Sequence, residues 1–263
     1  VLQLLASDPR ERPPDVIAVL EALAQLAPGA TRRVRPASAA DVALVGRTPD
    51  LDRLVARLGP APGPACVVLT GAGGIGKTRL LEAALDQLRV RGVRVASAVC
   101  RAGAGQGPAA LARLVTEAVS GADGRGASPE DALVQRHGAA LAHVLPALLR
   151  STDAADASAA PPGRQAIVTG LADLFLDAAR LRPLVLAVDD AHQADPFLLD
   201  VLAQVARRAG DVPLRIVAAV RPVEQDGPWR SFQRAGEAEG VLGLQTLGAL
   251  DRAGVRALAA EFL

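Results

Sequence analysis

One short stretch of the chain has glycines, a lysine and a threonine at the spacing of a phosphate-binding loop. It reads Gly71-Ala72-Gly73-Gly74-Ile75-Gly76-Lys77-Thr78 and fits the pattern G-x-x-x-x-G-K-S/T at every fixed position. Glycines allow the backbone to turn its N–H groups toward a phosphate. The lysine supplies a full charge for the β- and γ-phosphates of a nucleotide, and the threonine hydroxyl can ligate Mg²⁺. The stretch therefore predicts a site for ATP or ADP together with Mg²⁺.

The segments on either side of the loop are the elements that must position it. Cys66 to Thr70 is a short apolar run rich in β-branched residues, which predicts a buried strand. From Leu80 to Leu88, leucines and alanines recur at helical spacing. A loop that leads from a strand into a helix N-terminus adds partial positive charge to the phosphate site. The alternative, a chance glycine-rich turn, does not account for the strand, the helix and the Lys-Thr pair together.

We assign roles to the loop residue by residue. The positions expected to contact nucleotide are Gly71, Gly73, Gly74, Ile75, Gly76, Lys77, Thr78 and Arg79. Lys77 is also assigned to catalysis and Thr78 to the metal. Lys77 is the only lysine of the chain, and every other basic residue apart from the histidines is arginine. A compact ammonium suits a phosphate cradle that a planar guanidinium would not fit.

A second stretch ends in two carboxylates. Leu184 to Val188 is a continuous apolar run, followed by Asp189 and Asp190. Such a run is typical of a strand buried on both faces of a parallel sheet, and ligands bind at the C-terminal edge of such sheets. This is the Walker B pattern, in which Asp189 holds Mg²⁺ and Asp190 orients or deprotonates the attacking water. A strand that simply ends in a polar turn is the alternative.

Composition limits the classes of function. The chain has 263 residues, 50% of them hydrophobic and 22% charged, which allows one large α/β domain or a domain with an additional fragment. The net charge of +1 gives no indication of nucleic-acid binding. No apolar stretch is long enough to span a membrane and no signal peptide is visible, so we expect a cytoplasmic protein. The two cysteines, Cys66 and Cys100, are expected to be reduced core residues.

The segment before the loop carries a resemblance to a known family. Gly46-Arg47, followed by a helix with leucines at regular spacing, resembles the lead-in of bacterial AAA-type ATPases of the signal-transduction (STAND) class. The resemblance covers residues 44–263 and implies a P-loop NTPase three-layer α/β sandwich with about five parallel strands. It implies that Gly46 and Arg47 lie at the adenine, although Thr48 stands where the family usually has an acidic residue.

Two further stretches match the same family. Asp190-Ala191-His192-Gln193-Ala194-Asp195 is similar to its Asp-Asp-x-His-Trp-Ala-Asp, with Gln193 in place of Trp; Asp195-Pro196 also has the form of a helix N-cap. The apolar run from Leu214 to Val220 predicts a strand, and Arg221 follows it. The resemblance implies that Arg221 is a sensor that stabilises phosphoryl charge, and an ordinary loop arginine is the alternative.

Further strands are predicted near 92–100 and 241–247, and one helix is predicted over 130–150. Residues 1–27 contain a helix, Asp8-Pro9, Arg12-Pro13 and a second helix. This order resembles the end of a protein kinase C-lobe, and a plain helical hairpin is the alternative. Residues 28–43 have the composition of a linker. Because the chain begins with Val1 and the family continues with a further domain, we expect a piece of a longer protein, truncated at the C-terminal end of the ATPase domain.

Two functions remain open from the sequence. The first is a Mg²⁺-dependent ATPase that hydrolyses slowly and acts as a regulatory switch, in a signal-transduction or transcription regulator that is linked to a Ser/Thr kinase. This chain lacks the kinase glycine loop, catalytic-loop Asp and Asp-Phe-Gly, so it cannot phosphorylate by itself. The second is a scaffold that binds nucleotide and never hydrolyses it. Protein partners or self-association are expected in either case.

Overall fold

The computed structural model describes residues 44–59, 62–101, 107–120, 128–144, 163–222 and 226–262. All of them belong to one compact unit, Leu44–Leu263. The kinase-like tail predicted over 1–27 and the linker predicted over 28–43 lie outside the described residues.

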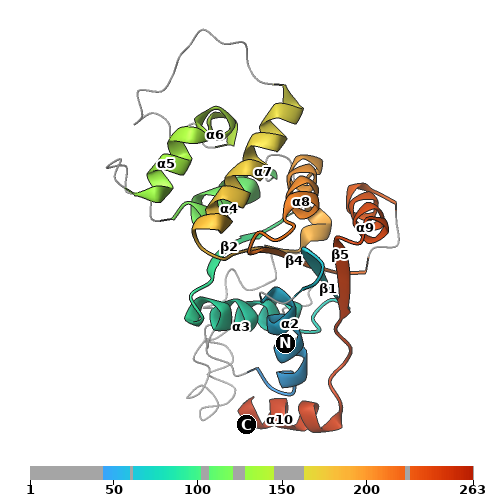
Figure 1. Cartoon of the computed structure of the whole chain (residues 1–263). Coiled ribbons are helices and arrows are strands. Elements are labelled where there is room, and N and C mark those ends of the chain that lie inside the picture. Colours follow the sequence, from blue (N-terminus) through green and yellow to red (C-terminus); the bar gives the residue numbers. More distant parts are fainter. Residues whose placement is uncertain are drawn as a thin grey trace, which may run out of the picture. The chain divides into compact units, whose positions relative to one another are not determined.

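A parallel sheet of five strands is the centre of this unit (Figure 1). Its strands are β1 (Cys66–Thr70), β2 (Arg94–Val99), β3 (Leu184–Asp189), β4 (Leu214–Val220) and β5 (Leu242–Thr246). Their spatial order is β2-β3-β4-β1-β5, and every neighbouring pair is parallel. Strand β4 therefore separates the strand that precedes the glycine loop from the strand that ends in Asp189. The predicted fold class, with about five parallel strands, is confirmed.

Helices cover both faces of the sheet and complete the three layers (Figure 1). Helices α2 (Thr48–Leu58) and α3 (Lys77–Val90) lie on one face, where leucines of both helices pack against Val67 and Leu69 of β1. Helices α4 (Gly107–Ala118), α7 (Arg164–Leu181), α8 (Pro196–Arg208) and α9 (Pro228–Ala238) lie on the other face. Helix α10 (Arg252–Phe262) follows β5.

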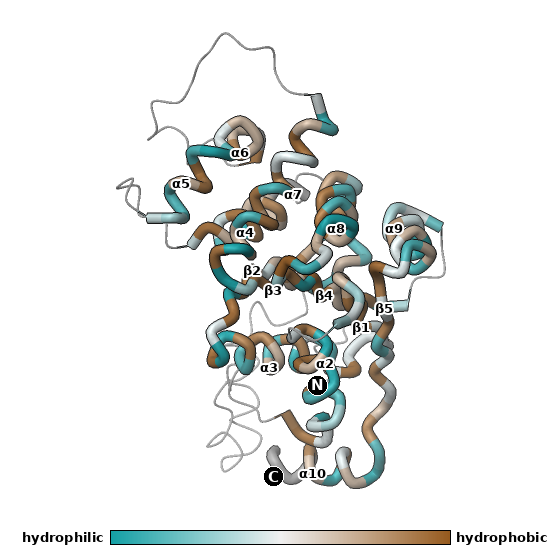
Figure 2. The backbone as a smooth tube through the Cα atoms, viewed as in Figure 1, coloured by the Kyte–Doolittle hydropathy of each residue, from teal (hydrophilic) through white to brown (hydrophobic). Residues whose placement is uncertain are grey.

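The strands are hydrophobic along their whole length because both of their faces are buried. Every residue of β3 is buried, and the alternate residues of β1 belong to different core clusters, Cys66 and Val68 to one and Val67 and Leu69 to the other. Figure 2 shows hydrophobic residues concentrated on the sheet and on the inner sides of the helices. This agrees with the continuous apolar runs of the sequence. A strand buried on one face only would instead alternate hydrophobic and polar residues.

The prediction of a single helix over residues 130–150 is wrong. The structure has two short helices there, α5 (Pro129–Arg136) and α6 (Gly138–Val144), with His137 between them; residues 145–150 lie outside the described part. The His137 ring lies 3.1 Å from Asp177 Oδ2 on α7, and Arg136 and Arg180 pair with the same carboxylate. A tertiary contact thus stabilises a helix end that the hydrophobic spacing alone does not indicate.

Candidate functional site

The glycine loop leads from β1 into α3, as its pattern predicts. Gly74 and Gly76 have φ angles of 73° and 98°, in the left-handed region that side chains rarely adopt. Helix α3 begins at Lys77, and its N-cap Gly76 makes no side-chain capping bond. The first N–H groups of a helix have no partner within it. These donors and the positive end of the α3 dipole are thus available to an anion.

Lys77 lies across this loop. Its ammonium donates hydrogen bonds to the carbonyl oxygens of Gly71 and Ala72, each at 2.8 Å, and the residue is 7% exposed. Burial lowers the pKa of Lys77 and nearby Arg221 lowers it further, whereas the carboxylates of Asp190 and Asp189 oppose the shift. The charge on Lys77 is therefore partly desolvated, which strengthens its interaction with a phosphate.

Thr78 and Asp189 are brought into direct contact, although 111 positions separate them in the chain. Thr78 Oγ1 donates a hydrogen bond of 2.7 Å to Asp189 Oδ2. The second oxygen, Oδ1, accepts the backbone N–H of Asp190 at 2.9 Å. Asp189 is buried to 9% exposure at the C-terminal end of β3. A hydroxyl and a carboxylate in contact beside a phosphate-binding loop form the pair of oxygen ligands that Mg²⁺ takes from a protein.

Asp190 lies just beyond the end of β3 and has an unusual backbone. With φ 50° and ψ 38°, it is the one residue other than glycine with a positive φ in the described part of the chain. Such strain is concentrated at functional sites, where the surrounding structure maintains it. His192 Nδ1 lies 3.9 Å from Asp190 Oδ1 and has no hydrogen-bond partner among the described residues. Burial lowers the pKa of His192, which favours the neutral ring, whereas the Asp190 carboxylate opposes the shift.

Arg221 follows β4, the strand between β1 and β3. A Cβ built on Gly73 would lie 3.7 Å from Arg221 Nη1, so the guanidinium lies beside the glycine loop. The strand order explains this position, because the residue after β4 must emerge between the loop after β1 and the carboxylates after β3. Arg221 and Lys77 thus place two positive charges at the glycine loop, and the carboxylates of Asp190 and Asp189 are close enough to act on the charge of Lys77.

Arg47 is 7% exposed and connects three segments. Its guanidinium donates hydrogen bonds to the carbonyl of Ile75 in the glycine loop at 3.2 Å and to the carbonyl of Gly248 after β5 at 2.7 Å. It also pairs with Asp50 in the first turn of α2 at 3.2 Å. Through these contacts Arg47 links the glycine loop to α2 and to the segment after β5.

The segment after β5 is part of the site, and the sequence did not indicate it. Leu247 N–H donates to Thr70 O at 2.8 Å, and a Cβ added to Gly71 would lie only 2.7 Å from Leu247 O. Gly46, with φ 68°, is in similarly close contact, since a Cβ there would lie 3.0 Å from Gly254 Cα. These approaches depend on β5 lying beside β1, and no local pattern predicts that pairing.

A family model agrees with this geometry. The model that describes the AAA ATPase domain matches residues 43–217, which is more than half of the chain. The chain belongs to the AAA ATPase domain family. No match was found among curated proteins.

Solved structures resemble the AAA ATPase domain only distantly. Cdc6p from Pyrobaculum aerophilum is 13% identical with a TM-score of 0.48, and the match covers 82% of this chain and 48% of that chain. The AMPPCP-bound DnaA from Aquifex aeolicus is 13% identical with a TM-score of 0.45 and covers 86% and 53%. The Orc1 protein from Aeropyrum pernix in complex with DNA is 16% identical with a TM-score of 0.48 and covers 86% and 52%. The chain spans about half the length of these proteins, and the likeness assigns it no substrate or partner.

The oxygen atoms of Thr78 and Asp189 are of the kind that Mg²⁺ prefers as ligands. In the described part, no group of three or more His, Cys, Asp or Glu side chains could hold a metal ion. Mg²⁺ needs no such group, because it is usually bound through one or two protein oxygens, substrate phosphates and water. The described thiols, Cys66 and Cys100, are free and buried, and burial raises the pKa of each to about 12.

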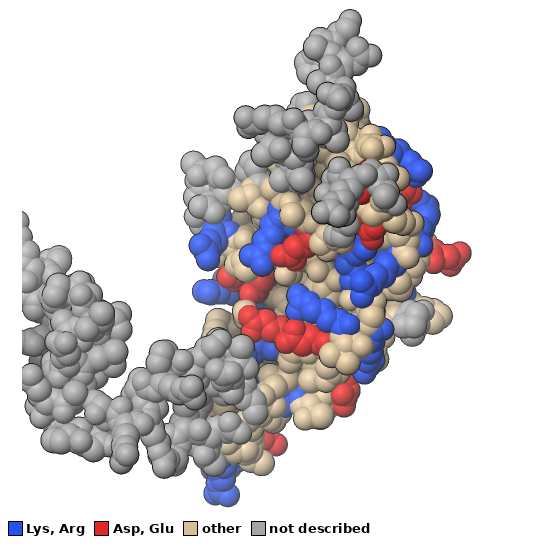
Figure 3. Space-filling model, turned by 90° about the vertical axis from the view of Figure 1, so that its left-hand side faces the viewer, with Lys and Arg blue, Asp and Glu red and all other residues tan. Residues whose placement is uncertain are grey.

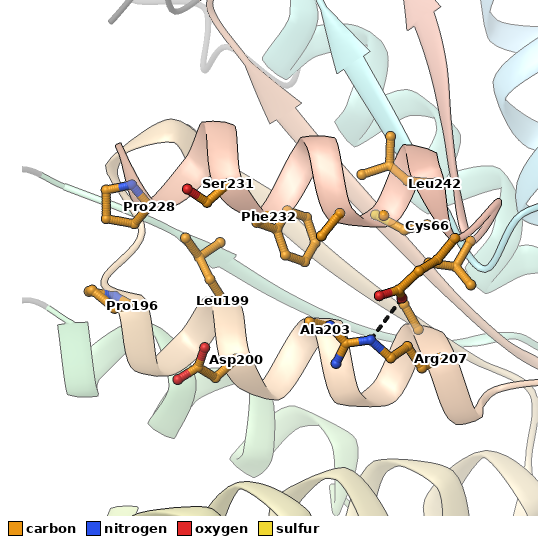
Figure 4. A pocket seen from close by; sticks show the side chains of 15 residues that line it. Cys66, Pro196, Leu199, Asp200, Ala203, Arg207, Pro228, Ser231, Phe232 and Leu242 are labelled. Atoms are coloured by element: carbon orange, nitrogen blue, oxygen red, sulfur yellow. Dashed lines mark hydrogen bonds and ion pairs between the residues drawn. The ribbon is translucent and has the colours of Figure 1, made fainter. Parts of the chain in front are cut away.

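An apolar cavity of about 330 Å³ lies between α8 and α9, away from this chemistry (Figure 4). Leu199 and Phe232 line it, and an ion pair between Arg207 and Glu239 of 2.8 Å borders it. Arg207 and its neighbour Arg208, which pairs with Asp173, thus both form ion pairs with side chains of this domain.

Among the described helices, none is long and apolar enough to cross a membrane.

Replacing Arg47 by Ala is expected to reduce the free energy of unfolding by about 2–4 kcal/mol, because two carbonyls and Asp50 lose a buried partner. Denaturant unfolding without nucleotide measures the effect. Arg53→Ala is the matched control: Arg53 pairs with the same Asp50 but its side chain is 58% exposed, so a loss of under ~0.5 kcal/mol is expected. Equal stability of the two variants would contradict this structural role of Arg47, whatever the effect on ATP affinity.

Proposed function

We propose that residues 44–263 bind ATP with Mg²⁺, hydrolyse it slowly and act as the switch of a bacterial signal-transduction protein. The observation that carries the proposal is the 2.7 Å hydrogen bond between Thr78 and Asp189. It joins the glycine loop to the acidic strand end across the strand that lies between them. Membership of the AAA ATPase domain family supports a nucleotide-dependent activity in general.

The residues have distinct roles in this proposal. The N–H groups of the loop and of the first turn of α3 bind the phosphates, and the Lys77 ammonium moves from the carbonyls of Gly71 and Ala72 to the β- and γ-phosphate oxygens. Thr78 and Asp189 would hold Mg²⁺, which neutralises phosphate charge when bound. Asp190 orients the attacking water or accepts its proton, and Arg221 stabilises the charge that develops on the phosphoryl group.

The proposal includes the remaining assignments. Arg79, whose side chain pairs with Glu82 at 3.7 Å, lies in the first turn of α3 and would contact nucleotide through its backbone, while Gly46 and Arg47 would border the adenine. We also propose that a kinase-like tail (1–27) and a linker (28–43) precede the ATPase domain. The basis for the tail is the pair of turns at Asp8-Pro9 and Arg12-Pro13. A cytoplasmic kinase-linked regulator that binds protein partners is consistent with these features.

Slow turnover is the expected kinetic property. Asp190 is one methylene shorter than the glutamate of motor ATPases, so its carboxylate reaches less far toward a water molecule. We expect the purified chain with ATP and Mg²⁺ to turn over below ~0.1 s⁻¹, against the roughly 1–10³ s⁻¹ of typical enzymes. A phosphate-release assay measures the rate. Rapid turnover without any partner would contradict a switch, and complete absence of turnover would favour the non-hydrolysing scaffold.

A further inference from the structure

A small cavity adjoins the nucleotide site on the α9 side of the sheet. Its volume is about 150 Å³, and the residues that line it include Thr70, Val220, Arg221, Trp229, Arg230 and Gln233. It is thus located at the C-terminal ends of β1 and β4 and at the first turn of α9. Arg221 belongs to this cavity and also lies beside Gly73 of the glycine loop.

Arg230 is a partly exposed residue of α9 with one buried donor that no described residue satisfies. This donor is its Nε. The nearest acidic side chain in the sequence, Asp226, pairs with Arg234 instead at 3.0 Å. A buried N–H donor such as this Nε costs free energy when it has no acceptor, and buried donors are almost always satisfied in folded proteins. An acceptor from outside the described protein atoms would remove that cost.

Among the described residues, the lining of this cavity includes two arginines, the exposed Arg221 and the partly exposed Arg230, and neither Asp nor Glu. Glu237, one turn from Gln233, accepts a hydrogen bond from the Gln233 amide at 2.9 Å. On the face shown in Figure 3, by contrast, basic and acidic side chains are interspersed. A pair of arginines lining a small cavity is a suitable environment for a tetrahedral oxyanion, which accepts several charge-assisted hydrogen bonds.

We propose that this cavity is a binding site for inorganic phosphate, separate from the glycine loop and linked to it through Arg221. Arg230 and Arg221 would hold the anion. If the domain hydrolyses ATP, as proposed above, the released phosphate is the anion that forms closest to this site. The binding itself does not depend on hydrolysis and can be tested without it.

The test is a calorimetric titration of the 263-residue chain with inorganic phosphate in the presence of saturating ADP and Mg²⁺. Arg230→Gln is expected to weaken phosphate binding by roughly tenfold or more, since a charge-assisted donor is lost. Arg234→Gln is the matched control on the same helix: its side chain is 63% exposed and does not line the cavity. It should bind phosphate as the unaltered chain does.

A second arm separates this proposal from the proposed function. Lys77→Ala removes the cation of the glycine loop, and phosphate should still bind to this variant and be lost from the double variant with Arg230→Gln. Thermal unfolding verifies that each protein is folded, and Arg230→Lys should restore part of the affinity. Equal phosphate affinity with and without Arg230→Gln, or no phosphate binding at all, would overturn the site. Failure of ADP to bind would count against the ATPase alone.

Discussion

Lys77→Ala is expected to weaken ATP binding by about thirtyfold or more, because removing a desolvated charge from its phosphate partners costs roughly 2–5 kcal/mol. Lys77 is the only lysine and is almost fully buried in the loop, so no neighbouring ammonium can replace it. Isothermal titration with ATP and Mg²⁺ measures the effect.

The control for this variant is Arg89→Ala. Arg89 is also on α3, but its side chain is 47% exposed and pairs with Asp86 at 2.7 Å, so the ATP affinity should not change. Because Lys77 also binds the carbonyls of Gly71 and Ala72, thermal unfolding should be recorded for both variants. A folded Lys77→Ala protein with unchanged ATP affinity would exclude the proposed binding of the ATP phosphates by Lys77 and the glycine loop.

Asp190→Asn is expected to lower the rate of ATP hydrolysis by about a hundredfold or more while ATP affinity stays within about threefold, because a general base contributes about 10²–10⁴ to rate. Asparagine is preferable to alanine here because Asp190 has a φ of 50°, a conformation that asparagine tolerates better than alanine. The variant therefore removes the carboxylate with little change of backbone strain.

Asp200→Asn is the control for Asp190→Asn. Asp200 lies on α8 with a side chain 55% exposed and pairs with Arg164, so turnover should not change. Single-turnover phosphate release and an ATP titration give the two measurements. Hydrolysis that persists in Asp190→Asn would contradict the role of Asp190 as the base or water-orienting group.

The parts of the fold that the sequence predicts correctly are those with strong local patterns. The glycine loop, the apolar run before Asp189 and the helix N-cap at Asp195, whose Oδ1 accepts the N–H groups of Phe197 and Leu198 at 2.8 and 3.2 Å, are each specified by neighbouring residues. The contact between Thr78 and Asp189 also follows, because both lie at the C-terminal edge of one parallel sheet.

The features of the fold that the sequence does not predict depend on the order of the strands or on contacts between distant residues. Nothing local indicates that β5 lies beside β1, so the contact of Leu247 with the glycine loop could not be foreseen. The sequence does not predict helix α9, because Trp229 and Phe232 are its only large apolar residues and form no extended helical pattern. The contacts of Arg47 with Ile75 and Gly248 likewise require the folded chain.

The most direct measurement of the central claim is a titration of labelled ATP with and without Mg²⁺, on the unaltered chain and on Asp189→Asn. If Thr78 and Asp189 hold the metal against the phosphates, Mg²⁺ should raise ATP affinity by about tenfold or more in the unaltered chain. The variant should lose most of that increase. ATP affinity that is the same with and without Mg²⁺ in the unaltered chain, or an increase that Asp189→Asn leaves intact, would contradict the account.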